Sequence, residues 1–302
     1  MDAILKQLRE ILKEGNVEKD LELKTHTYTH LGGKADYFVM PGSYEEVQQV
    51  IQFANKNNLP FTMLGNGSNL IIKDGGIRGI VMNLHNFNKV MTDGTKLIAQ
   101  SGARIIDASR KALEAELTGL EFACGIPGSV GGALFMNAGA YGGEIKDCLE
   151  STIVATKDGE LLELQAADLD LDYRTSNIPD NGYIVLEATF ALKQGDPAGI
   201  KAVMDDLTEK RETKQPLEYP SCGSVFKRPP GYFAGKLIQD SELQGKSIGG
   251  AEVSTKHAGF IVNKNDATAA EYIALIEFVQ KTVKEKFGVQ LEREVRIIGE
   301  DK

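Results

Sequence analysis

Two glycine-rich segments, GNGSN at residues 65–69 and GIPGSVGG at residues 125–132, restrict most strongly what this chain can form. Glycine adopts backbone angles closed to other residues, so such loops can turn N–H groups toward an anion without a cationic side chain. One loop alone commonly serves only a tight turn. Two of them, with a further glycine-containing segment at residues 137–142, favour a site in which a pyrophosphate lies between the loops.

Neither segment fits the two best-known nucleotide-binding motifs. The first loop lacks the third glycine of G-x-G-x-x-G and is followed by the apolar residues 70–72 instead of a helix, which argues against a Rossmann unit. Residues 245–247 (GKS) resemble the end of a P-loop, but Asp240 stands where that motif requires its first glycine, followed by Ser241. The glycine loops therefore belong to neither fold.

Hydrophobic periodicity predicts a mixture of helices and strands without internal repeats. A helix over residues 2–14 is expected to begin at Asp2 and to stop at Gly15, and a capping box at Ser43 is expected to open a second helix that ends near residues 57–58. The other predicted elements are strands at 36–40, 61–64, 70–72, 79–84 and 96–100, a helix at 105–117, strands at 151–156, 160–165 and 183–193, helices from 197 to about 214 and at 267–287, and a strand at 289–297. This mixture predicts the α+β class.

Composition limits the classes of partner. With 43 acidic and 34 basic residues and a net charge of -9, the surface repels polyanions, so we expect no nucleic-acid partner. The charged N-terminus and the lack of a membrane-length apolar run predict a cytoplasmic protein with no membrane partner. The spacing of Cys124, Cys148 and Cys222 matches no metal-binding or disulfide pattern. The four-residue spacing of His26 and His30 does not by itself indicate a metal site.

Further motifs follow the glycine loops in order along the chain. They are MNAGAYG at 136–142, YRTS at 173–176, CGSVF at 222–226 and EVR at 294–296, after the loops at 65–69 and 125–133. Over nearly its whole length the chain resembles the UDP-N-acetylenolpyruvoylglucosamine reductase family, also called the MurB family. Because no inserted tyrosine loop occurs between residues 199 and 214, it resembles the shorter, second type.

The resemblance implies a two-subdomain FAD-binding region of the vanillyl-alcohol-oxidase or PCMH type over residues 30–195, with subdomains at about 30–84 and 85–195. An N-terminal helix and lead-in over 1–29 would precede it, and an α+β substrate-binding domain over 196–302 would end in a catalytic strand. NADPH is the implied electron donor. Related oxidases attach FAD through a histidine in the first glycine loop, but this loop has none, so we expect non-covalent FAD.

The implied reaction reduces UDP-N-acetylglucosamine enolpyruvate to UDP-N-acetylmuramate in peptidoglycan precursor synthesis, with hydride from flavin N5 and a proton from a serine. By motif position Ser224 is the implied proton donor, Arg174 binds the developing enolate, and Glu294 assists protonation. A hydroxyl can protonate a strongly basic carbanion, and a guanidinium suits a carboxylate that gains charge. Taken without the motifs, they would be a turn serine, a surface arginine and an exposed glutamate on a half-solvated strand.

The resemblance also implies binding residues. Those expected to hold FAD are Gly65, Asn66, Gly67, Ser68 and Asn69, then Gly125, Ile126, Pro127, Gly128, Ser129, Gly131 and Gly132, and then Asn137, Ala138 and Gly139. An acidic protein must concentrate positive charge locally to hold a diphosphate, which favours Lys214, Lys227, Arg228 and Lys236. Arg228 departs from the family pattern, where asparagine is common.

Two other functions stay open. A flavin oxidase of the same fold would pass electrons to oxygen instead of taking them from NADPH. A non-catalytic protein that binds flavin or a UDP-sugar would have lost turnover. The presence of Arg174, Ser224 and Glu294 in their motifs argues against both alternatives.

Overall fold

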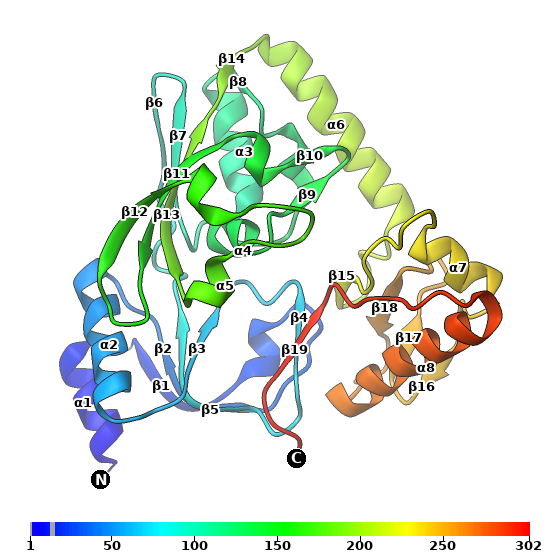
Figure 1. Ribbon diagram of the computed structural model, residues 1–302, viewed down its shortest axis with the longest axis horizontal. Coiled ribbons are helices and arrows are strands. Elements are labelled where there is room, and N and C mark those ends of the chain that lie inside the picture. Colours follow the sequence, from blue (N-terminus) through cyan, green and yellow to red (C-terminus); the bar gives the residue numbers. More distant parts are fainter. Residues whose placement is uncertain (1, 13–15) are drawn as a thin grey trace. The chain divides into compact units, whose positions relative to one another are not determined.

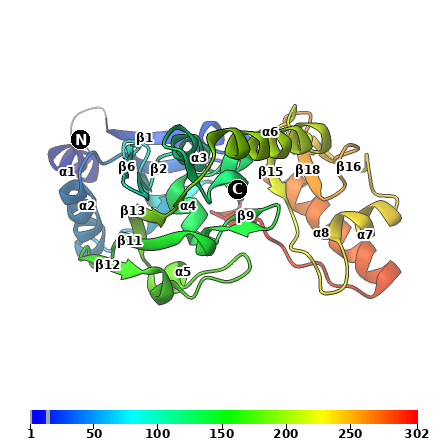
Figure 2. The same ribbon diagram turned by 90° about the horizontal axis from the view of Figure 1, so that it is seen from above.

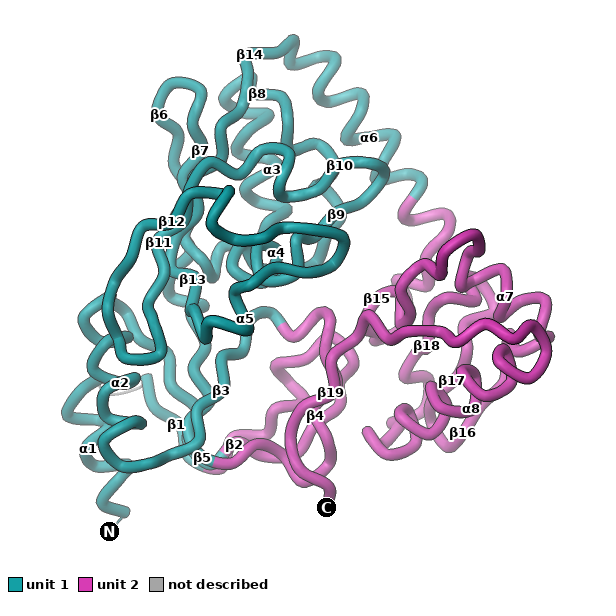
Figure 3. The backbone as a smooth tube through the Cα atoms, viewed as in Figure 1, with its two compact units in different colours: residues 1–19, 36–66, 79–210 teal, residues 20–35, 67–78, 211–302 magenta. Residues whose placement is uncertain are grey.

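The computed structural model describes residues 2–12 and 16–302, so the helix stop expected at Gly15 lies outside the described residues. The chain packs into two compact units, each assembled from separate stretches of sequence (Figure 3). The first unit comprises residues 1–19, 36–66 and 79–210, and the second comprises residues 20–35, 67–78 and 211–302.

These units differ from the continuous domains expected from sequence. Strand β4 (Leu70–Ile72) pairs in parallel with β19 (Arg296–Ile298), which brings residues 67–78 into one unit with the C-terminal residues. A short strand cannot satisfy its backbone groups alone, so its partner decides the unit to which it belongs. Domain boundaries at 30, 85 and 196 therefore remain a proposal.

The first unit contains a four-stranded sheet in the order β1-β2-β5-β3. Asp2 accepts hydrogen bonds from the first turn of one helix, and Ser43 accepts one from Glu46 N at the start of the other. Their apolar stripes pack on the sheet in one core, which includes Leu8 and Val50. The elements are α1 (Ala3–Ile11), β1 (Val17–Glu22), β2 (Lys34–Val39), α2 (Tyr44–Lys56), β3 (Phe61–Leu64) and β5 (Ile77–Asn83).

A second core in the same unit lies on a five-stranded antiparallel sheet in the order β12-β11-β13-β7-β6 (Figures 1 and 2). The strands are β6 (Val90–Asp93), β7 (Lys96–Gln100), β11 (Leu149–Ala155), β12 (Leu161–Gln165) and β13 (Ile184–Ala191). Helices α3 and α4 pack on this sheet, and shorter elements complete it. They are α3 (Ile105–Glu114), β8 (Leu117–Thr118), η2 (Glu121–Gly125), α4 (Val130–Phe135), β9 (Gly139–Ala140), β10 (Gly143–Glu144), η3 (Ile145–Asp147), η4 (Ala166–Leu169), α5 (Ile178–Asn181) and β14 (Lys193–Gln194).

Two helix predictions needed correction. The helix expected at 105–117 ends at Glu114, because Leu117 belongs to β8 and pairs with Gln194. Helical periodicity predicts that the inner face of α6 (Pro197–Lys214) comprises Ile200, Val203, Met204 and Leu207, but Val203 is 48% exposed. The buried stripe of α6 is narrower than expected and consists of Ile200, Met204 and Leu207.

The second unit has its own four-stranded sheet, in the order β15-β18-β17-β16, and its own core. Helix α8 starts at Thr268 with a reciprocal capping box to Glu271 and ends at Gly288, whose φ is 70°. Asp74 accepts hydrogen bonds from two further N–H groups of its first turn. The elements are η1 (Leu23–His26), β15 (Ser221–Ser224), α7 (Ala234–Asp240), β16 (Ser247–Ile248), β17 (Ala251–Val253), β18 (Phe260–Asn263) and α8 (Ala269–Phe287).

The strand predicted over 289–297 is wrong for residues 289–295. Strand β19 begins only at Arg296, although Leu291 and Val295 are buried as the alternation predicted. Among the residues before β19, an isolated bridge joins Arg293 to Phe226. Across residues 2–12 and 16–302, the structure contains no helix with the length and apolarity needed to span a membrane.

The carboxyl of Glu187 on β13 gives a testable prediction about how the stability of the fold depends on pH. It is half-buried, and burial raises its pKa, although a hydrogen bond from Tyr44 opposes the shift. A carboxyl with a raised folded-state pKa contributes stability below its unfolded pKa and loses it as the pH rises through the folded value. We therefore expect Glu187→Gln to raise the melting temperature at pH 7 and to lose this advantage near pH 4, as measured by thermal unfolding. The exposed Glu163→Gln is the control, and a gain independent of pH would contradict the account.

Candidate active site

Gly65 and Asn66, which begin the first glycine loop, are neighbours of the second glycine loop within the first unit. A Cβ atom built on Gly65 would lie 3.0 Å from Ser129 Oγ. Ser129 begins α4 and accepts a hydrogen bond from Gly132 N at 3.2 Å. Backbone hydrogen bonds to residues 103–105 hold the second loop. Ile105 N donates to Gly128 O at 3.0 Å, and Val130 N donates to Ala103 O at 2.8 Å.

Backbone N–H groups near this contact fit an anionic ligand. The backbone N–H groups of Asn66, Gly128 and Ser129 donate no hydrogen bond to any of the described residues. Ser129 is only 4% exposed, and such enclosed donors normally find a partner. The first turn of a helix adds a favourable potential for negative charge. The residues present therefore fit the diphosphate of a dinucleotide.

Asn83, which the sequence analysis missed, holds the first loop. Its Nδ2 donates to the carbonyls of Leu64 and Gly65 at 3.0 and 3.1 Å, and its Oδ1 accepts from His85 N at 2.8 Å. The residue is 8% exposed, so these bonds are largely shielded from water. Its only sequence signal is an amide at the end of a predicted strand, which by itself indicates no role.

Close packing explains two glycines in these loops. Gly67 has a φ of 65°, and a Cβ there would lie 2.3 Å from His26 O. A Cβ on Gly131 would lie 2.1 Å from Ser101 Oγ. The remaining expected cofactor residues Gly125, Ile126, Pro127 and Ser68 are half-buried, and Gly132 is exposed.

Four further residues expected to bind the cofactor also have contacts within the protein. Asn69 Nδ2 donates to Glu294 O at 3.3 Å, and Asn69 O accepts from Arg296 N at 3.2 Å. The Asn137 amide bonds within the first unit, and Ala138 packs into the core with Gly139 beside it in β9. A motif match alone does not separate side chains that face a ligand from side chains that hold the loop.

Arg174 lies at the tip of a tight turn in the first unit. Asp172 and Thr175 exchange backbone hydrogen bonds across this turn, and Arg174 itself has a φ of 56°. Its Nη2 donates to Gly139 O at 2.7 Å, and its guanidinium carbon lies 5.2 Å from the centre of the Tyr173 ring. The side chain is half-buried, with its orientation set on one side by a backbone carbonyl.

Ser224 and Glu294 lie on adjacent segments of the second unit. Glu294 N donates to Val225 O at 2.8 Å, and Lys227 N donates to Glu292 O at 2.9 Å. These bonds align the end of β15 with the segment that leads into β19. Glu294 is half-buried rather than exposed, so its sequence alternation alone would have misplaced it.

A buried pair supports the strand that carries Ser224. Cys222 Sγ lies 3.4 Å from Tyr272 OH, and this hydroxyl donates to Ile261 O on the neighbouring strand. Burial raises the pKa of the Cys222 thiol to about 11, so it stays protonated at neutral pH. All three cysteines are free thiols.

The cations expected to bind a diphosphate all belong to the second unit. Lys227 and Lys236 are paired with Glu292 and Asp240, each at 2.5 Å. The Arg228 guanidinium carbon lies 3.9 Å from the centre of the Phe233 ring. Lys214 is exposed on the last turn of α6. A diphosphate would have to compete with two acidic side chains for these lysines.

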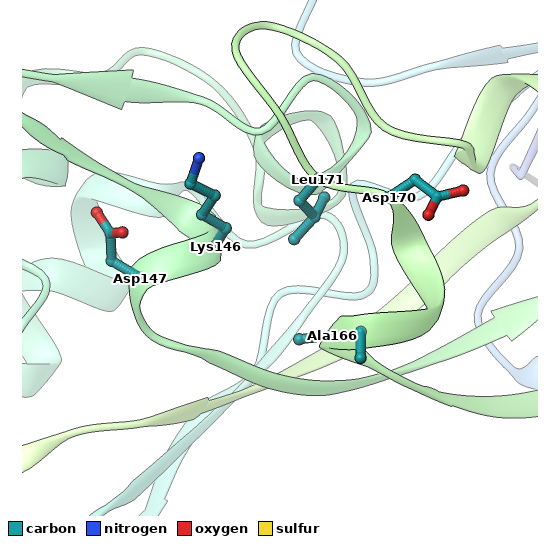
Figure 4. Close-up of a pocket in the computed structure, with 6 residues that line it drawn as sticks. Lys146, Asp147, Ala166, Asp170 and Leu171 are labelled. Atoms are coloured by element: carbon teal, nitrogen blue, oxygen red, sulfur yellow. The ribbon is translucent and has the colours of Figure 1, made fainter.

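A cavity of about 530 Å³ lies elsewhere in the first unit (Figure 4). Its lining contains none of the residues predicted for a site. The lining residues are Lys146, Asp147, Ala166, Ala167, Asp170 and Leu171. The glycine loops, and separately the segments that carry Ser224 and Glu294, therefore remain the candidate functional residues.

The adjacent glycine loops in an α+β unit define the class of protein as a flavoprotein whose FAD-binding region has the PCMH architecture. Residues 35–165 match the FAD binding domain, and residues 215–298 match the C-terminal domain of UDP-N-acetylenolpyruvoylglucosamine reductase. The chain belongs to the UDP-N-acetylenolpyruvoylglucosamine reductase family, as the relatives below establish.

Relatives match over nearly their whole length. A UDP-N-acetylenolpyruvoylglucosamine reductase of Oceanobacillus iheyensis is 75% identical over 295 residues, which make up 98% of this chain and 96% of that protein. The Geobacillus kaustophilus reductase is 65% identical over 300 residues, 99% of each chain. The crystal structure of the Thermus caldophilus reductase, MurB, matches with a TM-score of 0.81 at 33% identity, covering 93% of this chain and 98% of that one.

The Asn83 amide provides a test of the first glycine loop. Asn83→Ala leaves two backbone carbonyls and one N–H without their partner, which destabilises a fold by about 1–3 kcal/mol per buried group. We expect a lower free energy of unfolding and faster loss of flavin, measured by denaturant titration and by flavin fluorescence after dilution. Asn86→Ala is the control, because this exposed amide also bonds two carbonyls, those of Met40 and Pro41. Equal flavin retention in both variants would contradict the role of Asn83.

Proposed function

We propose that this chain reduces UDP-N-acetylglucosamine enolpyruvate to UDP-N-acetylmuramate in peptidoglycan precursor synthesis, with NADPH as electron donor and with non-covalently bound FAD. Family membership supports the reaction and both cofactors. The observation that carries the residue assignment is the hydrogen bond from Glu294 N to Val225 O, which brings Glu294 next to the residue that follows Ser224. Bound FAD supplies the hydride that adds to the terminal carbon of the enol ether.

The glycine loops are proposed to hold that cofactor. The N–H groups of Asn66, Gly128 and Ser129 would donate to its diphosphate, and the first turn of α4 would add favourable potential. A Cβ on Gly65 would lie 3.0 Å from Ser129 Oγ, so a side chain at this position would crowd the second loop. No histidine occurs in residues 65–69, which supports non-covalent attachment.

Ser224 and Glu294 are proposed to complete the reduction. When hydride adds to the terminal carbon, the electron pair of the double bond moves to the carbon beside the carboxylate. The Ser224 hydroxyl would give its proton to that carbon, and general acid catalysis of this kind contributes about 10²- to 10⁴-fold. Glu294, on the adjacent segment, would assist the proton transfer and help restore the hydroxyl.

Arg174 is proposed to stabilise the negative charge that develops on the substrate carboxylate. A guanidinium offers several N–H donors in one plane, so it can bind a carboxylate while one nitrogen bonds a protein carbonyl. The bond to Gly139 O sets the plane of this group before substrate arrives. Preorganised donors stabilise developing charge more effectively than donors that must first reorient.

Location and partners beyond the substrate are also proposed. Free thiols at all three cysteines agree with a cytoplasmic location, and the net charge of -9 disfavours nucleic acid. The basic residues Lys214, Arg228 and Lys236 are the proposed contacts of the UDP moiety. An oxidase function is the alternative, and it predicts oxygen consumption in place of NADPH consumption.

Product analysis tests the proposed reaction. Purified protein is incubated without oxygen with NADPH and the enolpyruvyl substrate, and the nucleotide sugar is examined by mass spectrometry. We expect a product heavier by one H₂ that matches UDP-N-acetylmuramate. An unchanged substrate beside a flavin that only oxygen reoxidises would support the oxidase and overturn the reductase.

The role of Ser224 is tested by separating the two half-reactions. In Ser224→Ala we expect reoxidation of the reduced flavin by the enol ether to slow by about 10²- to 10⁴-fold, while reduction of the flavin by NADPH keeps its rate. Rapid-mixing absorbance measurements follow both steps. Ser221→Ala, on the same strand, should behave as the wild type. Wild-type reoxidation in Ser224→Ala would remove the serine from the mechanism.

A further inference from the structure

Asn137 has a buried amide whose hydrogen bonds all go to protein. The residue is 0% exposed and has a φ of 45°, a left-handed conformation that asparagine tolerates better than most residues. Its Nδ2 donates to Glu144 Oε2 and to Asp172 O, both at 2.9 Å. Its Oδ1 accepts from Lys146 N, also at 2.9 Å. These bonds satisfy both N–H groups and the carbonyl oxygen, so this amide is not arranged to bind the cofactor.

The same bonds join two segments that are distant in sequence. On one side, Phe135 O accepts a hydrogen bond from Ser176 Oγ at 2.6 Å, and Gly139 O accepts one from Arg174 Nη2 at 2.7 Å. Asn137 lies between these two contacts and bonds Asp172 O. The turn that carries Arg174 is therefore attached to residues 135–139 at three successive points.

The Asn137 contact acts on the base of the turn. Asp172 O accepts from Asn137 Nδ2 and also from Thr175 N, the bond that closes the turn at 3.1 Å. Lys146 also lies near the base of the turn, with its Nζ 2.7 Å from Glu144 Oε1 and 4.0 Å from Asp172 Oδ1. Figure 4 shows Lys146 and Leu171 among the residues that line the cavity.

We propose that Asn137 is a positioning residue for Arg174, which rests on the substrate-binding role proposed for Arg174 above. Asn137 holds the carbonyl of Asp172, and thereby keeps the turn at the distance at which the Arg174 guanidinium meets Gly139 O. Residues 130–135 form α4, whose first turn is the end of the second glycine loop, so the segment that would hold the cofactor leads directly into the residues that contact the arginine. A displacement of about 1 Å of a catalytic group can slow a reaction by roughly 10²-fold.

The informative variant is Asn137→Gly, because glycine keeps the left-handed backbone without strain and removes only the amide. We expect reoxidation of the reduced flavin by the enol ether to slow by about 10- to 100-fold, while reduction by NADPH changes by less than about twofold. In a double-mutant cycle, adding Asn137→Gly to Arg174→Ala should not slow flavin reoxidation further, because both substitutions remove the same function. Rapid-mixing absorbance and flavin content are measured for each variant.

Two controls separate positioning from general damage. Glu144→Gln keeps an acceptor for Asn137 Nδ2 and should react as the wild type, and Asn181→Ala removes an exposed amide that bonds Asn177 O. If Asn137→Gly loses flavin, Asn137→Ser provides the same comparison. Loss of flavin from both, equal slowing of both half-reactions, or additive slowing with Arg174→Ala would overturn the positioning role.

Failure of the proposed function gives a different pattern. If the reduced wild-type flavin is not reoxidised by the enol ether at all, both the reductase assignment and the role of Asn137 are overturned. If the wild type and Asn137→Gly are reoxidised equally fast while Arg174→Ala is slow, only the role of Asn137 is overturned.

Discussion

The hydrogen bonds of the C-terminal segment are the constraint on which the second unit depends. Val225 O accepts from Glu294 N, and Asn69 O accepts from Arg296 N two residues later. The segment then continues as β19 beside β4, in parallel register from Arg296 opposite Leu70. One short run of backbone therefore bonds both the strand that ends in Ser224 and the end of the first glycine loop, and Glu294 lies between these contacts.

Near the glycine loops and near Arg174, side-chain amides satisfy backbone groups in the irregular segments of the first unit. Its loops must leave N–H groups for a ligand, so they cannot satisfy all their own backbone groups. Asn83 bonds the carbonyls behind Gly65, and Asn137 bonds the carbonyl below the turn of Arg174. A buried amide offers both donors and an acceptor, which suits a junction between irregular segments where no sheet ladder can form.

Much of the fold follows from local signals in the sequence. Periodicity and caps predicted α2 and α8 closely, and the strands at Phe61–Leu64 and Lys96–Gln100 were predicted at their observed bounds. The predictions of secondary structure and of domain limits fail where tertiary contacts determine which segments pair. Residues 289–295 alternate like a strand but find only an isolated bridge, and β4 joins the second unit because its partner is at the C-terminus.

The candidate site was predictable through its motifs, not through the individual side chains. The adjacency of the two glycine loops agrees with the prediction, and the motif residues Ser224 and Glu294 lie on neighbouring segments. Their catalytic roles stay predictions. Asn69 and Asn137 were assigned to the cofactor because they stand in glycine motifs, but their amides bond protein. Asn83 was missed, because its partners depend on a loop conformation that local sequence does not encode.

The central claim is that one protein accepts electrons from NADPH and passes them to an enolpyruvyl ether. The most direct measurement is the visible flavin spectrum without oxygen, during addition of NADPH and then of UDP-N-acetylglucosamine enolpyruvate. The account predicts bleaching by NADPH and recovery with the enol ether, but no recovery with UDP-N-acetylglucosamine. A protein purified without flavin, or a bleached flavin that only oxygen restores, would contradict it.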